Sequence, residues 1–361
     1  MISFLNIAFQ NKKINSYLQK NPFKGFVGPG KITRECEYLI SEITGSKYCI
    51  LTTSGTIALS LAALSLSLKK GDEIIVPSYG VISTSNAFSS IGFNIKLCEI
   101  EKKTGCLSVQ YLKKIVSKKT KAICFVNFSG YVGKELVNIR NFCKKRKIYL
   151  IEDSACALGN FYNNYSAGTF GDIGTFSLSS TKTITTGQGG IIIFKNKKHF
   201  QKALEIIDQG SNDWRKTNNH KKIGTNLKFN DILASFLQPQ LKEINKIVKK
   251  RILIHKLMFK GLYRQTFNIS KEISPLYNII FTHKRYELQR YLLSNKIKTV
   301  IQYKRINKNQ CYKKLTLKNY INSKFWEEKA LFLPMGSGLK KKDASKINNL
   351  LKKKKDLLAY L

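Results

Sequence analysis

The chain has 361 residues, which is long enough for two domains with a sizeable core and excludes the small disulfide-stapled class. Hydrophobic residues make up 43% and charged residues 24%, the ordinary balance of a soluble globular protein, so a disordered or collagen-like chain is excluded as well. The 63 Lys and Arg against 22 Asp and Glu give a net charge of +41, and the residues after 240 contribute 30 basic and 7 acidic side chains.

A surplus of this size would suit a polyanion such as nucleic acid, because Lys and Arg that neutralise phosphates release counterions. The basic residues are scattered through every segment, however, and few of them are Arg. We therefore interpret the charge as a lysine-rich background that would steer an anionic small substrate, and we expect no nucleic-acid partner. Polyanion binding through the basic C-terminal third is kept as a rival hypothesis.

The cysteine and histidine patterns indicate neither disulfides nor a metal site. The eight cysteines lack paired spacing of the zinc or redox type, and the four histidines are not clustered with Cys or carboxylates. We interpret the cysteines as reduced thiols of a cytoplasmic protein. The first residues do not have the pattern of a signal peptide, and the longest apolar stretch, 57–68, is far below the ~20 residues that span a bilayer.

In chain order, helical spacing predicts a helix over 33–44 that ends at Gly45 and a second helix over 56–69 that ends before Gly71. Four short apolar runs then predict strands, and the segment Glu135–Arg146 predicts a helix between the last two. The predicted strands are Glu73–Val76, Asn94–Cys98, Lys121–Val126 and Ile148–Glu152. Strands that alternate with helices of this length predict an α/β fold with a mostly parallel sheet.

Ligands of such sheets bind at the C-terminal ends of the strands. Asp153 and the stretch Pro77–Asn86 directly follow predicted strands and so occupy such positions. Nine of the 23 glycines fall between 130 and 190, which predicts tight turns or close backbone approaches there and places the site in this region.

Beyond residue 240, helical patterns over Leu241–Leu262 and Arg285–Ser294 flank a strand-like run, Tyr277–Thr282. The tail Lys340–Lys355 predicts an amphipathic helix that buries Ile347, Leu350 and Leu351. We predict a large domain over residues 1–244 and a smaller C-terminal α/β domain over 245–361.

Three separate segments carry residues that a pyridoxal phosphate site needs. Lys182 lies in a Ser/Thr/Gly-rich loop that begins near Ser177, and a lysine must hold the cofactor aldehyde. Ser54-Gly55-Thr56 opens a helix whose N-terminal N–H groups can bind a phosphate. Asp153 ends a buried strand, where a carboxylate could keep the pyridine nitrogen protonated.

With these residues in place, the chain resembles the DegT/DnrJ/EryC1/StrS family of sugar aminotransferases over nearly its whole length. The motifs that carry the resemblance are ordered along the chain: Val27-Gly28-Pro29-Gly30, Thr53-Ser54-Gly55-Thr56, residues 71–78, Ile151-Glu152-Asp153-Ser154-Ala155, residues 168–190, residues 224–231 and Leu333-Pro334. The run from Lys182 to Gly190 looks most like the perosamine synthase type, whose members aminate C4 of a 4-keto-6-deoxy nucleotide sugar.

The resemblance implies the fold type I architecture of aspartate aminotransferase and pyridoxal 5'-phosphate as cofactor. It implies that Lys182 is the catalytic lysine, that Asp153 pairs with the pyridine nitrogen, and that Gly55, Thr56 and Ser177 bind the phosphate. Asn226 would reach the phosphate of a neighbouring subunit, so the active sites would be shared within a homodimer. The implied reaction moves an amino group from L-glutamate to a keto nucleotide sugar, for surface polysaccharide or O-antigen biosynthesis.

Some positions depart from the family's pattern. Val81 stands where an aromatic ring normally stacks on the cofactor, and Tyr79 is the nearest substitute. Cys156 stands where the family usually has Gln or His beside the cofactor's phenolic oxygen, Leu158 replaces a common His, and Gln188 replaces an acid. These changes leave open a non-catalytic relative of the same fold. A sugar dehydratase is a further alternative, although the dehydratases of the family replace the lysine with His.

Overall fold

The computed structural model describes residues 1–5, 16, 19, 28–211, 220, 222–267, 273–315 and 320–360. Val27, the first residue of one family motif, and most of the segment before it lie outside the described residues.

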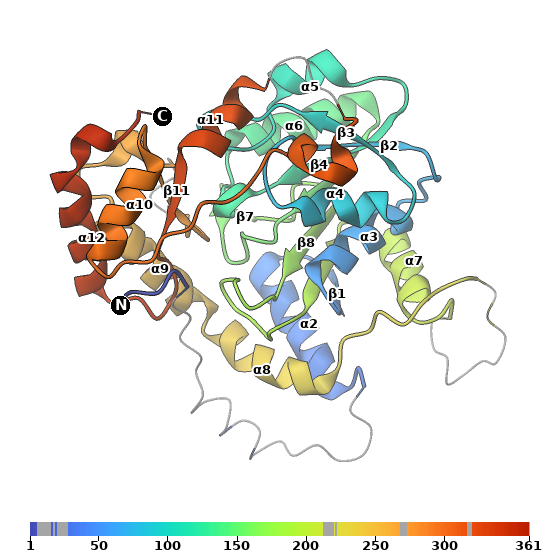
Figure 1. Cartoon of the computed structure of the whole chain (residues 1–361). Helices are drawn as coiled ribbons and strands as arrows, with labels where there is room; N and C mark the ends of the chain where they lie inside the picture. The colour runs from blue at the N-terminus through green and yellow to red at the C-terminus, as the bar shows by residue number, and fades with distance from the viewer. Residues whose placement is uncertain are drawn as a thin grey trace.

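A seven-stranded sheet forms the centre of the larger part of the molecule, in the order β1-β9-β8-β5-β4-β2-β3 (Figure 1). Its strands are β1 Tyr48–Thr52, β2 Glu73–Pro77, β3 Asn94–Cys98, β4 Thr120–Val126, β5 Tyr149–Asp153, β8 Ile173–Ser177 and β9 Gly190–Phe194. The pairs from β8 through β5, β4 and β2 to β3 are parallel, whereas β9 runs antiparallel to both β8 and β1. The predicted α/β class with a mostly parallel sheet is confirmed.

Helices cover both faces of this sheet. They are α2 Lys31–Thr44, α3 Gly55–Ser65, α4 Ile82–Ser89, α5 Val109–Ile115, α6 Lys134–Arg146, α7 Lys197–Ile207 and α8 Asp231–Lys242. Successive strand residues point to opposite faces, so Ile50, Ile74 and Val76 pack with α3, α4 and α7, while Leu51 and Ile75 pack with α2 and α6. The strand ends are thereby held between two apolar layers.

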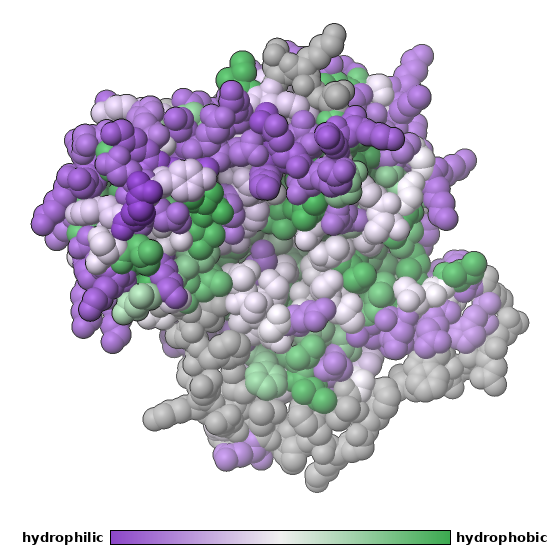
Figure 2. Space-filling model, viewed as in Figure 1, coloured by the Kyte–Doolittle hydropathy of each residue, from purple (hydrophilic) through white to green (hydrophobic). Residues whose placement is uncertain are grey.

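The C-terminal part has its own core around a two-stranded antiparallel ladder of β10 Asn278–Phe281 and β11 Ala330–Leu333. The helices α9 Ile244–Met258, α10 Arg285–Ser294 and α12 Lys341–Lys353 pack there, and α11 Ile321–Lys329 leads into β11. Ile347, Leu350 and Leu351 are buried, as the amphipathic pattern predicts. Figure 2 shows hydrophilic side chains gathered over these helices and paler residues toward the centre of the same face.

Two predicted helices differ in extent from those observed. The helix predicted over 56–69 begins at Gly55, where Ser54 caps it, and ends at Ser65, because Ser67 turns the chain through a left-handed conformation with φ of 62°. The helix predicted over 241–262 is not continuous, since α8 ends at Lys242 and α9 begins at Ile244. The break separates a helix that packs on α2 from one that packs on α12.

The predicted boundary at 244/245 lies at this break and stays a prediction. The first residues pair with the C-terminal part, since the Ile2 amide donates to the Lys296 carbonyl at 2.8 Å and the Met335 amide donates to the Phe4 carbonyl at 3.1 Å. Across the described ranges, none of the helices combines the length and apolar character needed to cross a membrane.

Candidate active site

Residues from separate segments meet at the C-terminal edge of the parallel strands. Asp153 is the last residue of β5, Ser177 is the last residue of β8, and Gly55 is the first residue of α3. Together with Lys182, which lies between β8 and β9, they line a cavity of about 370 Å³. Thr56 and Cys156 line it as well, so six of the seven predicted site residues are brought together.

Hydrogen bonds fix the loop that carries Lys182. The Lys182 amide donates to the Ser179 carbonyl at 3.0 Å. Further along, the Thr185 amide donates to Gln240 Oε1 at 3.0 Å, and Gln240 Nε2 donates back to the Thr185 carbonyl at 2.7 Å. Gln240 belongs to α8, so this helix holds the lysine loop against the sheet.

Asp153 is nearly fully buried, with 6% of its surface exposed. Its Oδ2 accepts a hydrogen bond of 2.6 Å from the Thr84 hydroxyl, and its Oδ1 accepts one of 3.2 Å from the Ala155 amide. Burial raises the pKa of Asp153, while the Thr84 hydroxyl and the charge of Lys182 oppose that rise by stabilising the carboxylate. The site therefore holds a carboxylate whose charge depends on its partners.

Lys182 Nζ lies 3.8 Å from the sulfur of Cys156. Burial lowers the pKa of the lysine, but Cys156, Tyr277 and Asp153 outweigh burial when they carry negative charge, and the net direction is upward. Burial also raises the pKa of both Cys156 and Tyr277, which keeps the thiol and the phenol protonated at neutral pH. Asp153 is then the anionic neighbour that stabilises the ammonium form of Lys182.

The start of α3 and the end of β8 form a narrow cradle. Ser54 caps the helix by accepting a hydrogen bond of 3.2 Å from the Ile57 amide. A Cβ added at Gly55 would lie 2.8 Å from the Cβ of Ser177, so the backbone approaches this strand end as closely as only glycine permits. Helix N-terminal amides beside a serine hydroxyl suit a phosphate group.

The cradle, the buried carboxylate and the buried amine fit the three parts of pyridoxal phosphate: phosphate, ring nitrogen and aldehyde. The cavity volume also falls in the usual range for cofactor sites.

The departures from the family's pattern have different outcomes. Val81 and Gln188 line the cavity, whereas Leu158 is buried in the core. The expectation that Tyr79 substitutes for the stacking ring is wrong. Its ring packs against Phe128 and Trp326, and its hydroxyl donates to the Gln302 carbonyl at 3.1 Å. Tyr79 therefore supports residues that line the cavity and is not among the lining residues itself.

Asn226 is exposed and does not line the cavity. Its backbone bridges to Asp208, at the end of α7. Its side chain is therefore exposed, and its role stays a prediction.

Pattern reasoning missed several residues that line the cavity, among them Tyr277, Gln302 and Phe128. The resemblance places Tyr303, Arg305 and Asn307 where relatives carry substrate-contacting residues, and of these three Tyr303 lines the cavity. Tyr277 immediately precedes β10, and no local motif marks it as a site residue. Thr84 falls within the stretch Pro77–Asn86 that sequence analysis identified, because α4 begins shortly after β2 ends.

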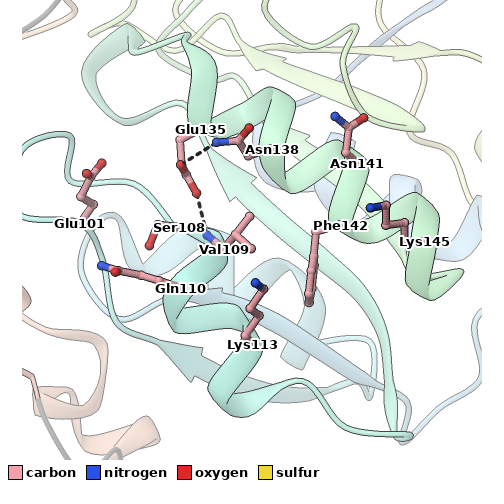
Figure 3. Close-up of a pocket in the computed structure, with 10 residues that line it drawn as sticks. All are labelled: Glu101, Ser108, Val109, Gln110, Lys113, Glu135, Asn138, Asn141, Phe142 and Lys145. Carbon is pink, nitrogen blue, oxygen red and sulfur yellow. Dashed lines mark hydrogen bonds between the residues drawn. The ribbon is translucent and has the colours of Figure 1, made fainter.

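A separate cavity of about 500 Å³ lies between α5 and α6 (Figure 3). In it the Glu135 carboxylate accepts hydrogen bonds from the Val109 amide at 2.6 Å and from the Asn138 side chain at 3.2 Å. This carboxylate thereby caps the first turn of α5. The cavity shares no lining residue with the one around Lys182.

Solved structures show the same architecture. The putative sugar aminotransferase of Streptococcus pneumoniae, in its PMP form, superposes with a TM-score of 0.89 over 98% of both chains at 21% identity. The fold is that of pyridoxal-phosphate aminotransferases of fold type I.

Curated relatives are also similar in sequence. GDP-perosamine synthase of Escherichia coli O157:H7 is 30% identical over 277 residues, which cover 75% of this chain and 76% of that protein. GDP-perosamine synthase of Vibrio cholerae is 32% identical over 226 residues, covering 62% of this chain and 60% of the relative. GDP-4-keto-6-deoxy-D-mannose 3-dehydratase of Escherichia coli O55:H7 is 33% identical over 226 residues, which cover 61% and 56% of the two chains.

Residues 9–352 match the model of one family, and the chain belongs to it: the DegT/DnrJ/EryC1/StrS aminotransferase family. Pyridoxal phosphate is the cofactor of these aminotransferases.

Proposed function

We propose that this protein is an aminotransferase that moves an amino group from L-glutamate to a keto nucleotide sugar, with a 4-keto-6-deoxyhexose as the sugar. The observation that carries the proposal is the placement of Lys182, Asp153, Ser177 and Gly55 around one cavity at the strand ends. The two GDP-perosamine synthase relatives support the choice of substrate class.

When bound, pyridoxal phosphate supplies an aldehyde that accepts an amino group and a ring that accepts electrons. Lys182 would hold that aldehyde, and its Nζ would then take and return the proton that moves in each half of the reaction. Asp153 would hold a proton at the ring nitrogen, which requires its carboxylate form. Thr84 favours that form by donating to Oδ2.

Gly55, Thr56 and Ser177 would bind the phosphate in the cradle at the start of α3. Cys156 would lie beside the phenolic oxygen of the ring, since its sulfur is next to Lys182 Nζ. The thiol is smaller than the Gln or His of relatives, and it leaves room on that side of the cavity.

A homodimer with shared active sites is part of the proposal. The exposed position of Asn226, away from the cavity of its own chain, supports a role in the site of a neighbouring copy. Light scattering of the purified protein gives its mass in solution. A mixture of inactive Lys182→Ala and Asn226→Ala chains should regain activity, because one site of each mixed dimer would have both residues.

The reaction would take place in the cytoplasm, and all eight cysteines are free thiols as expected for a reducing compartment. A contribution to surface polysaccharide or O-antigen synthesis stays a prediction.

The test is a mass-spectrometric screen of the purified protein with pyridoxal phosphate, glutamate and a panel of keto nucleotide sugars. Replacement of a keto oxygen by an amino group in one panel member is the expected result. Lys182→Ala should abolish it, whereas Lys197→Ala, an exposed lysine on α7, should not.

A dehydratase is the second candidate, because the 3-dehydratase relative is 33% identical over its matched segment. The same screen separates the two reactions, since dehydration removes a molecule of water without adding nitrogen. If loss of water is the main outcome, the protein is a dehydratase and the aminotransferase proposal is wrong. A protein that takes up no cofactor would instead support the non-catalytic alternative.

A further inference from the structure

The C-terminal part contributes a wall of hydrogen-bond donors to the cavity. Tyr303 donates its hydroxyl hydrogen to the Tyr277 hydroxyl at 2.9 Å, and both residues line the cavity with Lys182. Gln302, on the same wall, has a buried Nε2 with no hydrogen-bond partner within the described part of the chain. A hydroxyl on such a wall can donate a hydrogen bond to an oxygen atom of a ligand in the cavity.

The backbone beside Tyr277 is fixed from several directions. The Tyr277 amide donates to the Ser129 hydroxyl at 2.9 Å, and that hydroxyl donates to the Tyr277 carbonyl at 3.1 Å. The buried Arg251 donates from Nη2 to the carbonyls of Pro275 and Leu276, both at 2.9 Å. The backbone that carries the phenol is therefore fixed without help from a ligand.

Tyr303 is held in a similar way from the large domain. Its amide donates to the Tyr79 hydroxyl at 3.3 Å, and that hydroxyl donates to the Gln302 carbonyl. Because the Tyr303 hydroxyl donates to the Tyr277 oxygen, the hydroxyl hydrogen of Tyr277 is not used in that bond and can point into the cavity. Tyr277 and Lys182 line the same cavity, so the Tyr277 hydroxyl can reach a substrate that is held beside the lysine amine.

We propose that Tyr277 is a catalytic residue whose hydroxyl donates a hydrogen bond to the keto oxygen of the sugar substrate, with Tyr303 as the residue that orients it. The inference rests on the proposed aminotransferase function. A donor on the keto oxygen draws electrons from the carbonyl carbon and makes that carbon more reactive toward an amine. In the glutamate half, water supplies the keto oxygen of 2-oxoglutarate only in the last, releasing step, after the proton has moved, so we expect the larger effect in the sugar half.

The experiment follows each half-reaction separately by the absorbance of the cofactor-loaded enzyme. Tyr277→Phe should slow the sugar half by roughly 10²- to 10³-fold, the usual loss when one preorganised donor is removed, and leave the glutamate half within about twofold of wild type. Tyr303→Phe should produce a smaller loss in the same half. Tyr286→Phe, on the exposed surface of α10, serves as the matched control.

A binding measurement gives a readout independent of turnover. In a Lys182→Ala background, Tyr277→Phe should weaken binding of the keto nucleotide sugar about tenfold and leave the binding of an analogue without that oxygen unchanged. Equal losses in both half-reactions, or equal binding losses for both sugars, would overturn the proposal. A wild-type protein that aminates no keto sugar would overturn the proposed aminotransferase function. An active wild type with equal losses would overturn only the role of Tyr277.

Discussion

Asp153 and Thr84 form a hydrogen bond of 2.6 Å between the end of β5 and the first turns of α4, at the bottom of the proposed cofactor site. The two residues are far apart in the chain, and they meet because parallel strands β5 and β2 end at the same edge of the sheet. A hydroxyl that donates to a buried carboxylate stabilises its charged form.

Thr84→Val removes this donor and keeps the shape of the side chain. The pKa of Asp153, which burial already raises, should rise further, so the carboxylate should be lost at a higher pH than in the wild type. We expect cofactor affinity to fall about tenfold at neutral pH, since a hydrogen bond to a charged group contributes about 1.5–3 kcal/mol. The acid limb of the pH–rate profile should move to higher pH.

Thr84→Ser keeps the hydroxyl and is the matched control for that experiment. Its acid limb should coincide with that of the wild type. An unchanged acid limb in Thr84→Val would show that this hydrogen bond does not set the charge of Asp153.

Gly55→Ala should close the phosphate cradle. The added Cβ would lie 2.8 Å from the Ser177 Cβ, so either α3 or the end of β8 must shift. We expect at least a tenfold loss in pyridoxal phosphate affinity, measured by absorbance titration. Gly45→Ala, at the left-handed C-cap of α2, should lower thermal stability while leaving cofactor affinity unchanged. Equal affinity of Gly55→Ala and wild type would argue against a phosphate at this position.

The buried carboxyl of Glu152 should make the free energy of unfolding depend on pH. This carboxyl is fully buried, and burial raises its pKa from 4.5 to about 7 although the amides of Gly168 and Gly171 donate to it. Between these two pH values the folded protein binds more protons than the unfolded chain, so the free energy of unfolding falls as pH rises. At about 1.4 kcal/mol for each pH unit, the Glu152 contribution to that fall is roughly 3 kcal/mol.

Glu152→Gln cannot ionise and should lack this contribution. Denaturant unfolding of both proteins at about pH 4.5 and about pH 7.5 gives their free energies of unfolding. As pH rises, the free energy of unfolding of the variant should increase relative to that of the wild type. The comparison uses the change with pH, because the amide also alters the hydrogen bonds with Gly168 and Gly171 at every pH. A difference that stays constant between the two pH values would contradict the raised pKa.

The parts of the site that sequence analysis predicted are those with a local signal. Asp153 directly follows an apolar strand pattern, Gly55 opens a capped helix, and Lys182 lies in a loop rich in Ser, Thr and Gly. The fold then brings them together through the parallel order of the strands, which the alternation of strands and helices predicts.

The residues that sequence analysis missed depend on packing between distant segments. Tyr277 reaches the cavity because Ser129 holds its backbone and Arg251 holds the carbonyls of the two residues before it. Both partners are distant in the chain, so the sequence near Tyr277 does not indicate these contacts. Nearness to Val81 in the sequence suggested a stacking role for Tyr79, but Gly80 turns the chain between them with φ of 140°, and the Tyr79 ring is buried in the core. The break at Glu243 likewise follows from the two different surfaces on which α8 and α9 pack.

Borohydride reduction of the protein loaded with pyridoxal phosphate, followed by peptide mapping, identifies the lysine that holds the cofactor aldehyde. We expect a single labelled peptide whose modified residue is Lys182, and no label there in Lys182→Ala. A labelled lysine elsewhere, with Lys182 unmodified, would contradict the assignment of this cavity as the active site.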